Sequence, residues 1–146
     1  MSTLKFKNGD LASIQEFLSG ARLSGKASRG RSKLIKLITA KEKELQEDFD
    51  EARKPFILLD ENGNPIIENQ GVKFKDETAR QKATNEMLIL LDEEAVINVT
   101  EYEAKLVNLY DALADYPHEL DGKQAVGYDV LLDQLEELKE GTHDVE

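Results

Sequence analysis

The sequence predicts a mainly helical α+β fold, with about five helices, a β-hairpin and one short antiparallel sheet. Apolar residues recur at three- and four-residue intervals over most of the chain, which is the period of an amphipathic helix. Strict alternation occurs only in short runs, and Asn62-Gly63 is a strong signal for a tight hairpin turn. The length of 146 residues fits a single domain, 1–146.

Residues 1–55 are expected to form a strand, a short helix and a long helix. Alternation over 4–7 predicts the strand, and a long helix is expected from about 28 to 54 because Pro55 clashes with a preceding helical turn. The short helix between them is predicted by an apolar stripe at Leu11, Ile14, Phe17, Leu18 and Ala21.

The hairpin is expected over 56–75, further helices over 76–138, and a frayed tail over 139–146. The β-branched run 96–99 interrupts these helices, and we expect it to pair with the strand at 4–7. Thr100, with an acid three residues later, matches a capping box and predicts a helix start.

Charge is distributed unevenly along the chain. Residues 1–41 hold nine Lys and Arg against two acids, a formal net charge of +7, whereas residues 42–146 hold ten against twenty-eight, a net of −18. The start of the long helix is a basic segment containing Lys26, Arg29, Arg31, Lys33 and Lys36. Cations there face the positive end of the helix dipole, so something else should compensate them.

Three explanations of the basic segment stay open. Its cations can pair with the acidic part of this chain or of a second copy, bind a separate protein, or hold a nucleic acid or phosphorylated ligand. Nucleic acid is disfavoured because no aromatic side chains interleave with the cations and the remaining surface repels a polyanion. We therefore expect another protein or self-association, with the cations serving electrostatic docking.

An acidic stretch of the long helix is the alternative binding surface. Its carboxylates could occupy a partner's basic groove as nucleic-acid phosphates do, although solubility is the ordinary role of such a surface. The residues concerned are Glu44, Glu47, Asp48 and Glu51.

Motifs for catalysis or metal binding are missing from the sequence. The absence of cysteine excludes disulfides and thiol chemistry, and His118 and His143 lack metal-ligand spacing. The stretch 60–71 begins like a calcium loop but has Pro65 and Gly71 where Gly and an acid are required. We expect no enzyme activity, catalytic residue, metal or cofactor. No apolar run could span a membrane and no signal peptide is recognisable, so an intracellular protein is expected.

The order of several motifs resembles a known family. "LKFKNGDL", "LSGKASRGRSKLIKLI", "DENGNPII" and "DEEAVIN" follow one another over roughly residues 3–135. This arrangement is similar to the small phage and prophage proteins of the DUF1617 family, which have no assigned function. The resemblance implies a phage-encoded accessory protein in the cytoplasm of a host bacterium or associated with the virion. It implies no activity and no site residues.

These observations together predict a non-enzymatic interaction protein, such as a virion-assembly or tail-region factor or another accessory factor. The alternative is an acidic inhibitor of a host defence or nucleic-acid enzyme, acting by protein binding or nucleic-acid mimicry.

Overall fold

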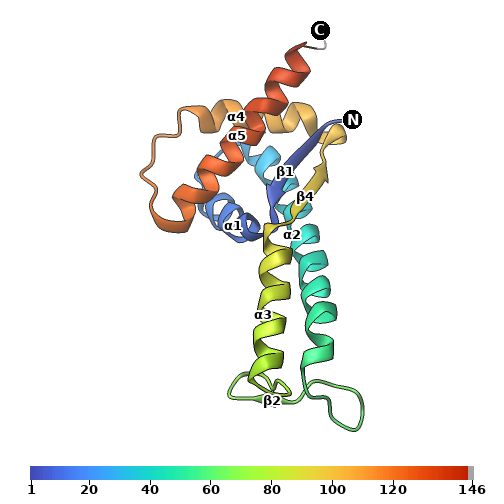
Figure 1. Cartoon of the computed structure of the whole chain (residues 1–146). Coiled ribbons are helices and arrows are strands. Elements are labelled where there is room, and N and C mark those ends of the chain that lie inside the picture. Colours follow the sequence, from blue (N-terminus) through green and yellow to red (C-terminus); the bar gives the residue numbers. More distant parts are fainter. Residues whose placement is uncertain (145–146) are drawn as a thin grey trace. The chain divides into compact units, whose positions relative to one another are not determined.

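The computed structural model describes the backbone of residues 1–144 and the side chains of residues 1–141. It contains five α-helices and two antiparallel sheets of two strands each within the described chain, which confirms the predicted fold class (Figure 1). The chain divides into two compact units. Unit 1 is Met1–Glu42 with the chain from Glu94 onward, and unit 2 is Lys43–Glu93. A single domain over 1–146 stays a prediction.

Unit 1 combines a strand pair with helices packed around one apolar core. The first part of helix α2 (Gly25–Arg53) belongs to it. Its other elements are β1 (Thr3–Lys7), α1 (Leu11–Gly20), β4 (Glu94–Asn98), α4 (Glu103–Ala114) and α5 (Gly122–Asp144).

The two strands pair as expected from their sequences, antiparallel and without a bulge. Leu4 lies opposite Ile97 and Phe6 opposite Ala95, and all four side chains are buried. The residues between them, Lys5 in β1 and Val96 in β4, are exposed. The period of two therefore places one face of the sheet on the core and the other in solvent.

Two glycines allow the helices of unit 1 to approach closely. A Cβ built on Gly127 of α5 would lie 2.1 Å from the Ser13 carbonyl oxygen of α1, and one on Gly30 of α2 would lie 2.4 Å from the Lys105 carbonyl oxygen of α4. Apolar side chains fill the space around these contacts, including Ile14, Phe17 and Leu18 from α1, Leu34 and Ile38 from α2, Leu106, Leu109 and Leu113 from α4, and Leu131 and Leu135 from α5.

Two local predictions in unit 1 need correction. The backbone N–H of Thr100 donates to the Asn98 side-chain oxygen at 3.0 Å, and Glu103 accepts a hydrogen bond from the Ser2 hydroxyl, so no capping box forms. A 3-10 turn precedes α4 instead. The last helix continues to Asp144, past the predicted start of the tail at residue 139. The end of that tail, residues 145–146, lies outside the described residues.

Unit 2 contains the end of α2, helix α3 (Glu77–Asp92) and a small sheet between them, β2 (Ile67–Glu68) with β3 (Gly71–Val72). Asn62-Gly63 forms a turn as predicted, with Gly63 at φ +80° and a bridge between Leu59 and Pro65. The regular strand pair, however, flanks the next turn, at Asn69-Gln70. Around the first turn the Asp60 N–H donates to the Asn64 carbonyl at 2.8 Å and the Ile66 N–H donates to the Leu58 carbonyl at 3.0 Å, but this pairing amounts to a single bridge and not a strand.

Candidate functional site

Four of the five predicted cations lie on one side of α2. Lys26, Arg29, Lys33 and Lys36 follow one another at steps of three, four and three residues, which keeps them on one side of a helix. We call these four residues the basic face. Three of them are exposed, and Lys33 is half-buried with its Nζ 5.4 Å from the centroid of the Tyr102 ring. That cation–π contact holds one charge of the basic face in place.

Arg31 is not part of the basic face. Its guanidinium donates to the Ala21 carbonyl and, at 3.0 Å, to the Ser28 hydroxyl. Ala21 follows the end of α1, so Arg31 ties the connection between α1 and α2 and is half-buried there. Its contacts give Arg31 a structural role, and its predicted part in partner binding stays a prediction.

A shallow groove of about 400 Å³ runs beside the basic face. Arg29 and Lys33 line it from α2, and Lys105 lines it from α4. The remaining lining comes from Gly25, Ser28 and Ser32, so no carboxylate contributes to it. No feature of the sequence singles out Lys105, because only the packing of α4 on α2 at Gly30 brings this lysine to the groove.

The basic face has no ion pair within the described chain. None of its four side chains has a carboxylate oxygen within 4.0 Å among residues 1–141. Pairing with the protein's own acidic residues, which was one of the three explanations, is therefore not seen there. The cations remain available to another molecule, and their partner-binding role stays a prediction.

The predicted acidic surface lies in unit 2, on the second part of α2. Glu44, Glu47, Asp48 and Glu51 are all exposed, and their positions at i, i+3, i+4 and i+7 place them on one side of the helix. Glu47 and Glu51 also line a groove of about 340 Å³, together with residues of the following loop such as Leu59. The four carboxylates thus form the patch that the alternative function requires.

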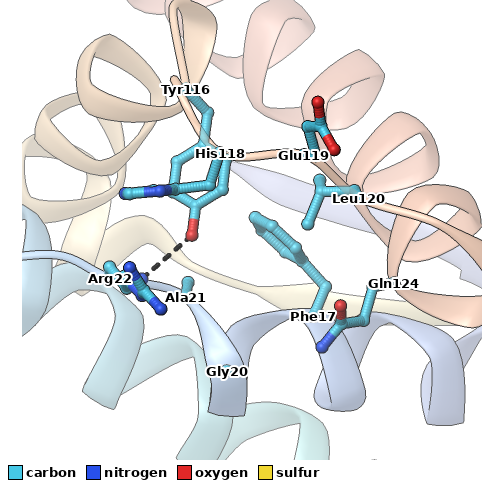
Figure 2. A pocket seen from close by; sticks show the side chains of 9 residues that line it. All are labelled: Phe17, Gly20, Ala21, Arg22, Tyr116, His118, Glu119, Leu120 and Gln124. Carbon is cyan, nitrogen blue, oxygen red and sulfur yellow. Dashed lines mark hydrogen bonds between the residues drawn. The ribbon is translucent and has the colours of Figure 1, made fainter.

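A separate pocket of about 300 Å³ opens between the end of α1 and the loop that precedes α5 (Figure 2). Phe17 is one of its lining residues, and Arg22 and His118 lie beside Tyr116 at one side. The Arg22 backbone N–H donates to the Tyr116 hydroxyl at 3.0 Å, and the rings of Tyr116 and His118 meet edge to face at 5.1 Å. Tyr116 also meets the Phe17 ring edge to face at 5.6 Å, so three aromatic side chains line one pocket.

The fold and these surfaces can be set against known proteins. A family model described as "Protein of unknown function (DUF1617)" matches residues 2–142. The chain belongs to the DUF1617 family. This confirms the family that the motif order suggested. No curated protein and no solved structure matches the DUF1617 protein. In the described part of its chain, no helix is long and apolar enough to cross a membrane.

Tyr128 gives the DUF1617 protein a pH-dependent contribution to stability. Its hydroxyl donates to the Leu113 carbonyl at 2.6 Å, and burial, followed by the charges of Asp129 and Asp115, raises the pKa of the phenol above the ordinary 10.0. Since the folded state holds this proton more tightly, the stabilisation is complete below pH 10 and is lost as the pH rises through the folded-state pKa.

We expect the free energy of unfolding to fall more steeply above about pH 10 in the wild type than in Tyr128→Phe, because the variant has no phenol at this position. Urea unfolding followed by circular dichroism between about pH 9 and 11 measures both slopes. Identical slopes would show that Tyr128 titrates alike in the folded and unfolded chains.

Proposed function

We propose that this protein is a phage- or prophage-encoded, non-enzymatic interaction protein that docks onto an acidic protein surface through the basic face. It acts as an accessory factor, such as a virion-assembly or tail-region factor, in the cytoplasm of the host bacterium or in association with the virion.

The main support for this proposal is the basic face. Four cations share one side of α2, none has a carboxylate within 4.0 Å in the described chain, and Lys105 adds a fifth positive charge across the groove. The chain as a whole has a formal net charge of −11, so the basic face is a positive patch on a protein that is otherwise negative. Such a patch orients an acidic partner and speeds its approach.

A second candidate rests on the acidic patch of unit 2. Glu44, Glu47, Asp48 and Glu51 are exposed on one side of α2 and could enter the basic groove of a host defence or nucleic-acid enzyme. On this alternative the protein is an inhibitor, and its binding is expected to weaken steeply with salt because its contacts are ionic.

The two candidates are separated by reversing charges on one surface at a time. We expect Arg29→Glu/Lys33→Glu to lose at least about tenfold in affinity for the physiological partner, because two attractive contacts become repulsive.

A pull-down from phage-infected host lysate, treated with nuclease, identifies the partner. Titration of the purified partner by isothermal calorimetry then measures the affinity. Arg31 is left unchanged because its guanidinium holds the connection between α1 and α2.

The matched control is Lys82→Glu/Lys123→Glu, which changes the net charge by the same amount at exposed positions outside the basic face. It should bind like the wild type. Equal loss in both double variants would mean that net charge alone governs binding. Retained binding by Arg29→Glu/Lys33→Glu, with loss in Glu47→Gln/Asp48→Asn/Glu51→Gln, would transfer the function to the acidic patch.

A further inference from the structure

The two strands of the unit 1 sheet differ in what covers their outer edges. The Lys5 N–H of β1 points away from β4 and donates to the Gln134 side chain of α5 at 2.8 Å. Helix α5 packs along β1, as Figure 1 shows. The β1 edge is therefore closed by a helix and by a specific hydrogen bond.

Among the described residues of unit 1, no helix and no hydrogen bond is seen to close the outer edge of β4. Residues in an antiparallel ladder alternately point their backbone groups toward and away from the partner strand. Val96 lies opposite Lys5, so its N–H and C=O also point outward, and the same holds for Glu94 and Asn98. No backbone hydrogen bond joins these outward groups to another residue within the described chain. Exposed edges of this kind accept a further strand.

The side chains of β4 do little to protect this edge. Natural edge strands are blocked by prolines, bulges, short length or charged side chains, lysine above all. Glu94 places one charge at the start of β4. The register of β4 is continuous over its five residues, and the strand contains neither Pro nor Lys. Val96 projects from its solvent face with 45% of its surface exposed. The edge is thus regular, apolar at its centre and open.

The sequence of β4 fits a second copy of itself. We propose that two molecules associate through β4 of each, antiparallel about a twofold axis at Val96, into a four-stranded sheet. Val96 then lies opposite its equivalent and exchanges both backbone hydrogen bonds with it, while Glu94 lies opposite Asn98 of the partner. No like charges face each other, and two half-exposed valines become neighbours on one face. This proposal is independent of the partner of the basic face.

Such a dimer is expected to be weak. Five residues of strand per molecule bury less surface than the roughly 1,000 Å² of a stable interface. The net charge of −11 on each copy adds a repulsion that salt screens. Dimer formation should therefore increase with protein concentration and with salt, whereas an interface built on ion pairs would weaken with salt.

Sedimentation velocity over a concentration series, at low and moderate salt, measures this equilibrium. We expect a monomer at low concentration and a species of twice that mass at high concentration. Val96→Lys should shift the midpoint at least tenfold upward, because two lysines would face each other across the axis. Val96→Pro removes only an outward N–H, which an edge strand tolerates, and should abolish the dimer. Circular dichroism checks that each variant remains folded.

The chain offers a closely matched control. Val126 of α5 is 50% exposed, so Val126→Lys makes the same substitution at similar exposure away from the strand and should dimerise like the wild type. The wild type has no cysteine, so Val96→Cys and Val126→Cys are single-thiol proteins. Cα atoms of a hydrogen-bonded pair lie about 5.5 Å apart, within disulfide range. Mild oxidation should cross-link Val96→Cys, and not Val126→Cys, into a dimer.

Three results would overturn the proposal. One is a wild type that stays monomeric at all concentrations, and another is a dimer that survives both Val96→Lys and Val96→Pro. The third is equal cross-linking of Val96→Cys and Val126→Cys. This test does not depend on whether Val96→Lys or Val96→Pro folds.

Discussion

Replacing Gly127 by alanine is expected to destabilise unit 1 by at least about 2 kcal/mol, since overpacking against rigid neighbours costs about this much or more. The new Cβ would lie 2.1 Å from the Ser13 carbonyl oxygen and 2.9 Å from the Ile14 nitrogen. These are backbone atoms inside α1, so they cannot rotate away as a side chain would. The two helices must separate and lose the close packing around Ile14. Alanine's higher helix propensity, about 1 kcal/mol, offsets only part of the loss.

Gly141 provides the control in the same helix. No atom lies within 4 Å of a Cβ built there, so Gly141→Ala should leave stability unchanged or raise it by up to about 1 kcal/mol. Urea unfolding followed by circular dichroism compares both variants with the wild type. If Gly127→Ala were as stable as Gly141→Ala, α1 and α5 would not be packed at the distance described.

Phe17→Ala is expected to cost about 3–5 kcal/mol of stability, the range for truncating a fully buried aromatic side chain. Phe17 is 1% exposed, and its ring meets those of Tyr116 and Tyr128 at centroid distances of 5.6 and 5.3 Å, both edge to face. Truncation leaves a cavity and removes both ring contacts, each worth about 0.5–1.5 kcal/mol. The same change removes one of the side chains that line the pocket in Figure 2.

Phe17→Leu separates apolar burial from the aromatic contacts. It fills most of the space and should lose clearly less stability than Phe17→Ala, because apolar burial is the larger part of the effect. Thermal and urea unfolding provide the comparison. A loss below about 1 kcal/mol in Phe17→Ala would mean that the site collapses and that Phe17 is not central to the core.

Much of the fold follows from periodicity. Alternation at Leu4 and Phe6 predicts one strand, the β-branched run 96–99 predicts a second, and the structure pairs the two as expected. Periodicity predicts the positions of the turns less well. Asn62-Gly63 is the stronger turn signal, yet the regular strands flank Asn69-Gln70, because a local turn preference does not decide how far the flanking residues continue as a ladder.

The candidate site was only partly predictable for a similar reason. Residue spacing alone separates Arg31 from the rest of the basic segment, but its bonds to Ala21 and Ser28 depend on how the chain turns after α1. Lys105 and Gly30 could not have been linked from sequence, because a glycine within a helix looks like a weak point until a neighbouring backbone is seen against it. The sequence shows which residues carry charge, but it does not show which other residues surround them in the fold.

The pairing of Thr3 with Asn98 has a consequence for how the protein is made. Unit 2 is contiguous and can fold during synthesis, whereas unit 1 is interrupted by it. Strand β1 and helix α1 leave the ribosome first, but β1 can pair only after β4 is synthesised, and α1 can pack on α5 only after that helix is synthesised. At about 5–20 residues per second the delay is on the order of ten seconds. During that interval Leu4, Phe6 and Phe17 are uncovered, so a nascent chain stalled before its last helix would be a chaperone substrate.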